Sequence, residues 1–284
     1  MLGLLGKPKI LWVGALIQSV ALLLIYSQIV TTDGKQNTFS LYFSNLCEVS
    51  VYFLAALINF RISSEYKTNQ LMRLAWIFLG LNALISVGRA FIGLPFWDHF
   101  IEGFITSRFN DNIHKVIIAF ANGFLLMGLS AMWLSFKKSD LGFEIGTRGY
   151  VEIACILLLT FVLFFRIKVD PYSSGLVILS AASIASVILH KMALQMGGGK
   201  LAICLRILTL YTLMRAVFVL IETLLGLGDI ERRQQIDWIM AVDLVVWKLV
   251  PWIAAIAASY RAEMIVHSRI ELEKSRVEIV RATA

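Results

Sequence analysis

The stretch AICLRILTLYTLMRAVFVLIETLLGL, residues 202–227, decides the fold class of this chain. It is far longer than a strand, and its apolar residues do not alternate with polar ones as they do in a membrane β-barrel. A helix needs about 20 mainly apolar residues to cross the hydrocarbon core of a bilayer. The stretch therefore predicts a transmembrane helix, and one that carries an arginine and a glutamate in its interior.

Further stretches of the same kind make most of the chain apolar. Its 284 residues are 58% hydrophobic and 16% charged, and the mean hydropathy of +0.77 is far above that of a soluble domain. The sequence predicts an all-α, polytopic integral membrane protein with about eight transmembrane helices. Only a short connection at 166–170 separates two of the windows, so one of them could be re-entrant, which would leave seven. The eight windows are 9–31, 41–62, 71–94, 115–136, 148–167, 173–193, 202–227 and 237–260.

The lysines and arginines predict the orientation, because cytoplasmic loops carry an excess of them. With the N-terminus inside, sixteen of them fall in cytoplasmic segments and seven on the opposite side. Both termini are therefore predicted to be cytoplasmic, and the net charge of +7 is mostly a topology signal. No basic run interleaved with aromatic residues occurs outside the windows, so we expect no nucleic-acid partner.

The chain divides into a predicted transmembrane bundle, residues 1–260, and a cytoplasmic amphipathic helical tail, residues 261–284. In this tail Ile265, Leu272 and Ile279 recur at seven-residue spacing between charged residues. Such a helix lies on the anionic inner leaflet, or it pairs with a second copy of the chain in a homodimer.

The cysteines and histidines indicate no disulfide framework and no metal site. The three cysteines lie inside windows without a CxxC pair, and the four histidines lie apart, near predicted membrane edges. No nucleotide-binding motif occurs either, so we expect no cofactor. The residues are Cys47, Cys155 and Cys204, and His99, His114, His190 and His267.

Charged side chains within the windows are the strongest functional signal, because such residues are costly in a membrane and face a bundle interior or a wet cavity. Counting inward at about 1.5 Å per residue places Arg89, Glu222 and Asp243 roughly 10 Å from the outer side. Arg215 and Lys248 lie about two turns deeper. This predicts an outward-facing polar pocket with a carboxylate-rich rim and a cationic floor. The charged residues are Glu48, Arg89, Arg215, Glu222, Asp243 and Lys248.

Helical phase adds Phe218 to this predicted ligand-binding set. Arg215, Phe218 and Glu222 are spaced so that they share one face of a helix. Asp243 and Lys248 lie about 140° apart around theirs, so each is expected to meet a different helix. The alternative interpretation is that the charges only fix helix packing, together with interhelical hydrogen bonds from polar residues. These polar residues are Asn82, Asn122, Ser130 and Thr212.

The segments LYTLMRAVFVLIETLLGLGD and IDWIMAVDLVVWKLVP, within residues 209–251, resemble the last two helices of the fungal lipid-translocating exporter family, the aminocholesterol-resistance proteins. The matching positions are an arginine, an aromatic residue, a glutamate, a turn glycine and an intramembrane aspartate. The chain departs from the family at Val219, where the family usually has a second arginine, and in having Lys248. The resemblance implies outward movement or sensing of amphiphilic lipids. The matching residues are Arg215, Phe218, Glu222, Gly226 and Asp243.

Three functions are compatible with these features. The first is a protein that binds an amphiphilic lipid or other lipophilic small molecule in the pocket and exports or translocates it. The second is an integral-membrane enzyme in which Glu222 or Asp243 acts as a catalytic acid, in the manner of a terpene cyclase or isomerase. The third is a seven- or eight-helix membrane sensor. Lys248 suggests a retinal protein, but Asp243 lies five residues before it instead of four. We expect translocation rather than catalysis.

Overall fold

The computed structural model describes residues 7–31, 38–92, 107–139, 144–166, 173–196, 198–224 and 237–283. Side chains are described over most of these ranges, but not near several helix ends, among them 25–42, 107–115, 163–174, 222–247 and 276–283. The described part forms eight long helices and contains no strand, which confirms the all-α class. The helices are α2 (Pro8–Thr31), α3 (Thr38–Glu65), α4 (Gln70–Ile92), α6 (Ser107–Lys138), α7 (Gly146–Arg166), α8 (Ser173–Gln195), α9 (Gly199–Leu224) and α11 (Asp237–Thr283).

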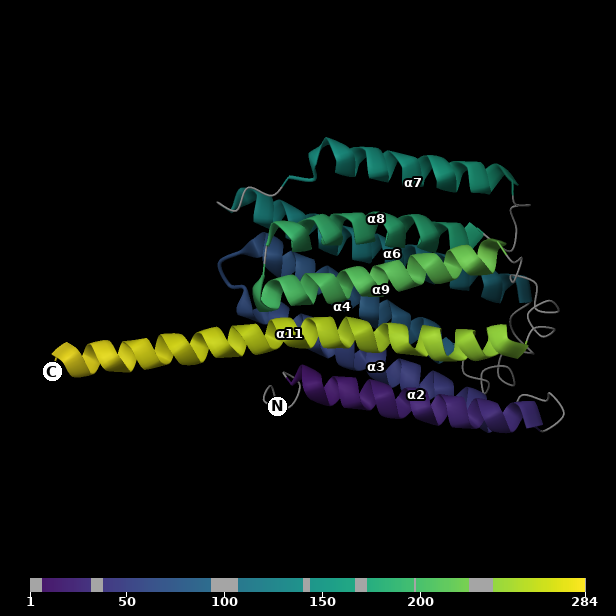
Figure 1. Cartoon of the computed structure of the whole chain (residues 1–284), viewed down its shortest axis with the longest axis horizontal. Coiled ribbons are helices and arrows are strands. Elements are labelled where there is room, and N and C mark those ends of the chain that lie inside the picture. The colour runs from purple at the N-terminus through teal and green to yellow at the C-terminus, as the bar shows by residue number, and fades with distance from the viewer. Residues whose placement is uncertain are drawn as a thin grey trace.

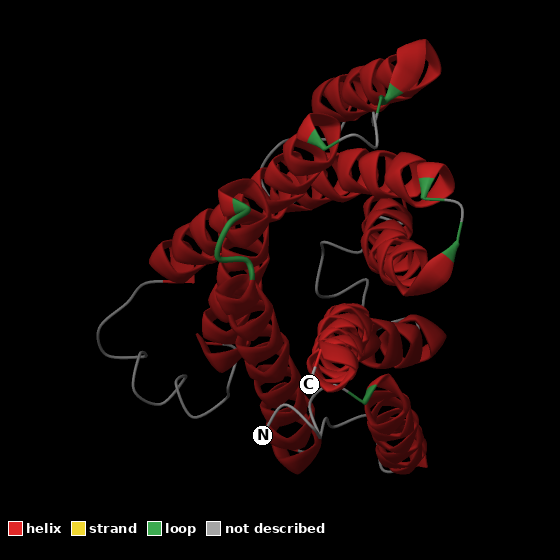
Figure 2. Cartoon of the chain, turned by 90° about the vertical axis from the view of Figure 1, so that its left-hand side faces the viewer, coloured by secondary structure: helices red, strands yellow, loops and turns green. Residues whose placement is uncertain are grey.

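Six of the helices close into a ring. Going round it, each helix packs on the next in the order α3, α4, α6, α8, α9, α11 and back to α3. Figure 2 shows this arrangement from one end of the bundle. These six are also the helices whose described residues are long and apolar enough to span a membrane. The chain is therefore a multi-pass membrane protein, and the ring has an interior to which six helices contribute.

The remaining two helices, α2 and α7, lie outside the ring. The main contact of α2 is with α11, and the described apolar part of α2 is Pro8–Leu24. The main contact of α7 is with α8, at the opposite edge of the molecule (Figure 1). An ion-pair cluster joins α7 to α8. Glu152 of α7 lies 3.3 Å from Lys191 of α8 and 3.1 Å from Arg148 of α7.

The short connection at 166–170 does separate two helices. α7 ends at Arg166 and α8 begins at Ser173, and the two pack side by side (Figure 1). Val151, Leu158 and Phe161 of α7 are exposed on its outer surface, as expected of side chains that face lipid. The count of eight helices is therefore confirmed, whereas the membrane crossing of α2 and α7 stays a prediction.

Small residues let the ring helices approach closely. Ala55, Ala75, Ala182, Ala185 and Ala257 are completely inaccessible to solvent. Close packing through such residues is how helices associate in a membrane, where apolar burial alone gives no preference for protein over lipid. Small buried residues thus contribute to the packing of the ring helices.

The described ends of the chain lie at the same end of the bundle (Figure 1). This agrees with an even number of spans. The C-terminal tail, 261–284, is not a separate element, because α11 continues without interruption from Asp237 to Thr283 and projects beyond the other helices. Its pairing with a second copy and its contact with the inner leaflet stay predictions.

Candidate functional site

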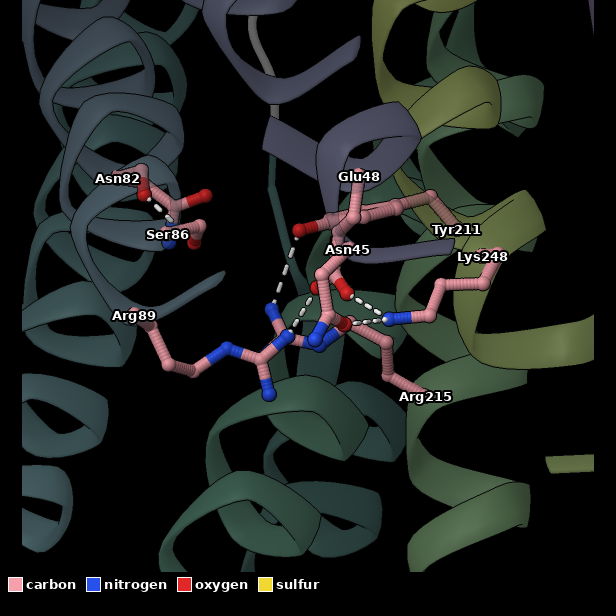
Figure 3. A network of polar contacts seen from close by, with 8 residues as sticks. All are labelled: Asn45, Glu48, Asn82, Ser86, Arg89, Tyr211, Arg215 and Lys248. Carbon is pink, nitrogen blue, oxygen red and sulfur yellow. Dashed lines mark hydrogen bonds and ion pairs between the residues drawn. The ribbon is translucent and has the colours of Figure 1, made fainter. Parts of the chain in front are cut away.

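Glu48 of α3 is the centre of a buried polar cluster inside the ring (Figure 3). Only 3% of its surface is exposed. One carboxylate oxygen accepts a hydrogen bond from the Arg89 guanidinium of α4, and the other accepts one from the Lys248 ammonium of α11. Lys248 also donates a hydrogen bond of 3.0 Å to Asn45 Oδ1. One acid therefore ties together three helices, and both seams of α3 within the ring include a charged contact.

Local sequence explains how α3 and α11 present these groups. Asn45 and Glu48 are three residues apart, so they share one face of α3 and meet the same ammonium. Lys248 lies three residues before Pro251, which is buried within α11. Proline cannot donate a backbone hydrogen bond to the carbonyl four residues earlier, which loosens the turn in which Lys248 lies.

Arg215 of α9 approaches the same region from the opposite side of the ring (Figure 3). It is 8% exposed. Its guanidinium donates to the Tyr211 hydroxyl at 3.1 Å and to Asn122 Oδ1 of α6 at 3.3 Å. It also lies 5.5 Å from the centre of the Tyr211 ring, within cation–π distance. Its Nε has no hydrogen-bond partner, so this buried cation contacts only neutral groups among the described residues.

A cavity lies between the two arginines. It has space for about one water molecule between its walls. The polar part of its lining comes from α3, α4, α6 and α9, and the apolar part includes isoleucines of α6 and α8. The lining residues are Tyr52, Ser86, Arg89, Ile117, Ile118, Ala121, Asn122, Ile178 and Arg215.

Uncharged polar residues brace the helices around this cavity. Asn82 of α4 donates a hydrogen bond of 2.6 Å to the Ala121 carbonyl of α6. Ser186 of α8 and Thr212 of α9 share one of 2.8 Å. These two contacts are interhelical, as the packing interpretation predicts for Asn82 and Thr212. Asn122 also accepts an interhelical hydrogen bond, from Arg215, and lines the cavity, whereas Ser130 is exposed. Packing therefore accounts for part of the polar set and leaves the cavity residues to be explained.

The structure brings together four of the seven predicted ligand-binding residues, Glu48, Arg89, Arg215 and Lys248. The predicted separation between Arg89 near the rim and Lys248 at the floor is not present, because both contact Glu48. The cause is that a long lysine or arginine side chain covers more than one helical turn, so Cα depth does not fix the depth of the charge.

Of the three other predicted residues, only Phe218 has a described side chain. Phe218 is 8% exposed and is buried one turn from Arg215 on α9. The side chains of Glu222 and Asp243, the two candidate catalytic acids, lie outside the described residues. Among the described residues, no three His, Cys, Asp or Glu side chains lie close enough together to hold a metal ion.

Asn45, Tyr52, Ser86 and Tyr211 belong to the site but were not predicted from the sequence. A signal existed for Asn45 and Tyr211, which lie three and four residues before a predicted charge and so share its helical face. No comparable signal marks Tyr52, because a tyrosine in an apolar window is also typical of the membrane interface.

Comparison with known proteins adds no family. No protein-family model matches the chain, and searches of curated proteins and of solved structures also give no match. The resemblance of residues 209–251 to the lipid-translocating exporters thus stays a prediction from the sequence, and the function has to be argued from the ring interior.

Proposed function

We propose that this chain binds an amphiphilic lipid or another lipophilic small molecule inside the six-helix ring and translocates it through the membrane. The observation that carries the proposal is the cavity, whose lining combines cationic and hydrogen-bonding groups with isoleucines. An amphiphile likewise combines a polar and an apolar part. Packing alone does not require a polar cavity beside a buried arginine whose Nε has no partner.

The architecture supports movement as well as binding. Every ring helix contributes a residue to the cavity or to the Glu48 cluster: Glu48, Arg89, Asn122, Ile178, Arg215 and Lys248. A ligand that displaced any of these contacts would alter the packing of helices on both sides. Translocation needs such a coupling between a binding site and the seams that must open.

Lipid binding can be tested by native mass spectrometry of the purified protein combined with lipid extraction. We expect a co-purifying amphiphile in the wild type and its loss in Lys248→Met, which removes one cation from the ring. Lys191→Met is the matched control, because Lys191 pairs with Glu152 outside the ring, between α7 and α8. This control should retain the ligand.

Translocation is tested separately in proteoliposomes that contain a fluorescent lipid, with a membrane-impermeant quencher added outside. We expect the protein to expose inner-leaflet lipid to the quencher, and Lys248→Met to slow this on the order of tenfold, the equivalent of about 1.4 kcal/mol. The proposal fails if empty and protein-containing vesicles exchange lipid equally and neither the wild type nor Lys248→Met retains an amphiphile. The ring charges then serve only to hold helices together.

A further inference from the structure

The described charges inside the ring do not balance. Arg89, Arg215 and Lys248 are cationic, whereas Glu48 is the one acid among the described side chains that contact them. Its two oxygens are taken by Arg89 and Lys248, and Arg215 contacts no described carboxylate. Removing a guanidinium from water is costly unless an anion accepts its hydrogen bonds. Among the described side chains that contact one another here, the cations thus outnumber the acids, which favours binding of an anion beside Arg215.

The position of Arg215 indicates where this anion would lie. Arg215 is 92% buried, since 8% of its surface is exposed, and it lines the cavity together with Arg89. The two guanidinium groups approach the middle of the ring from opposite sides (Figure 3). Ser86 and Asn122 add neutral hydrogen-bonding groups to the same lining. A planar guanidinium with free donors is suited to bind a carboxylate or phosphate oxygen.

The size of the cavity favours a carboxylate. Its interior has space for about one water molecule, so a planar carboxylate requires less widening of the cavity than a tetrahedral phosphate with its ester substituents. The apolar part of the lining continues from Ile178 to a buried cluster between α8 and α9, formed by Leu176, Leu179, Ala182, Ala216 and Val219. These side chains are at most 6% exposed, so a hydrocarbon chain attached to the carboxylate would part this packed cluster and lie against its apolar side chains.

We propose that Arg215, assisted by Arg89, binds the carboxylate of a lipophilic acid, with the hydrocarbon tail directed along Ile178 toward the α8–α9 cluster. This inference rests on the proposed function and defines its ligand class. It excludes cationic amphiphiles from the cavity and assigns neutral ones a weaker affinity, because they leave Arg215 without an anion.

The test measures equilibrium binding of four probes to the full-length protein in a non-ionic detergent. Dodecanoate, dodecanol and dodecylamine share one tail and differ in head group, whereas acetate has the carboxylate without the tail. We expect dodecanoate to bind at least about tenfold more tightly than dodecanol, a typical difference for one charge-assisted hydrogen-bond pair. Dodecylamine and acetate should bind weakest.

Two variants test whether Arg215 causes the preference for dodecanoate over dodecanol. Arg215→Gln should bind dodecanoate and dodecanol equally, whereas Arg215→Lys should keep part of the preference because it keeps the charge but not the planar fork. Arg206→Gln is the matched control, because Arg206 lies on the exposed surface of the same helix. It should bind all four probes like the wild type.

The probe series on the wild type keeps the inference falsifiable even if the Arg215 variants fail to fold. Equal binding of dodecanoate and dodecanol would overturn the anion site and leave the proposed function intact. If acetate binds as tightly as dodecanoate, the hydrocarbon tail makes no contribution, and the site binds a small free anion instead of a lipophilic acid. If none of the three dodecyl probes binds and vesicle translocation is also absent, the inference and the proposed function both fail.

Discussion

At Glu48, one carboxylate neutralises two cations from two different helices, with Arg89 at one oxygen and Lys248 at the other. Its side chain is 4% exposed, and that of Lys248 is 12% exposed, so water replaces neither contact readily. Removal of one partner from a buried ion pair is far more damaging than loss of the pair as a whole, because it leaves an uncompensated charge. The stability of the cluster therefore depends more on Glu48 than on either of its two cations.

Glu48→Gln should destabilise the protein by about 3 kcal/mol, because it leaves two cations in the ring without their anion. The measurement is unfolding by SDS in mixed micelles, followed by circular dichroism. The double variant Glu48→Gln/Lys248→Met should be more stable than Glu48→Gln alone, since it removes one of the unpaired charges. A double variant less stable than the single one would contradict this account.

Glu152→Gln is the matched control for this experiment. Glu152 also pairs with two cations, Arg148 and Lys191, but 34% of its side chain is exposed. Exposed ion pairs contribute about 1 kcal/mol or less, because water and salt screen them. We therefore expect this variant to unfold within about 1 kcal/mol of the wild type.

Residue-level reasoning from the sequence identified the charges but not their partners. The cost of a charge in an apolar window marks Glu48, Arg89, Arg215 and Lys248 wherever the helices lie. Which of them meet depends on which helices are neighbours in the ring, and spacing within a single helix carries no information on this. The contact of Lys248 with α3, two hundred residues earlier in the sequence, could not have been predicted in this way.

At the scale of elements, α2 depends on one close contact with α11. A Cβ atom on Gly14 would lie 2.5 Å from the indole of Trp252, and this indole donates a hydrogen bond of 2.7 Å to Gln18 of α2. The indole thus fills the space over the glycine and is held there by a residue one turn further along. Gly14 is required at this crossing for its lack of a side chain.

Gly14→Ala should destabilise the protein by about 1–3 kcal/mol, the usual cost of an overpacked contact. The measurement is the same SDS unfolding. Gly123→Ala is the control, because nothing lies within 4 Å of a Cβ atom built there. It should be neutral or stabilising by up to about 1 kcal/mol through its better helix propensity. Equal effects of the two substitutions would mean that α2 does not depend on this crossing.

At the scale of the whole molecule, the fold predicts on which side of the membrane each connection lies. Ser139 follows α6 and Ser173 begins α8, so α7 lies between them. In a variant without native cysteines, Ser139→Cys and Ser173→Cys should react with a membrane-impermeant maleimide from opposite sides, with Ser139→Cys on the cytoplasmic side. Labelling of both positions from one side would mean that α7 does not cross the membrane.

Most of the fold could be predicted from the sequence, whereas the closed ring could not. The length of each apolar window sets the number of helices, and the predicted window 173–193 differs from the observed α8, Ser173–Gln195, by two residues at one end. The order around the ring depends on side-chain packing between helices that are all apolar, for which a single sequence has no pattern. The continuation of the last window into a helix of 47 residues follows from the lack of any glycine or proline after Pro251.

Because α11 is one continuous helix, a movement of its part inside the ring also moves its part outside the ring. Its inner arm carries Lys248, and its outer arm runs to Thr283, beyond the rest of the molecule. At 1.5 Å per residue the outer arm, residues 261–283, is about 35 Å long. A tilt of about 5° at the ring would swing its tip by about 3 Å. A tilt of α11 within the ring is thereby amplified into a larger displacement at Thr283.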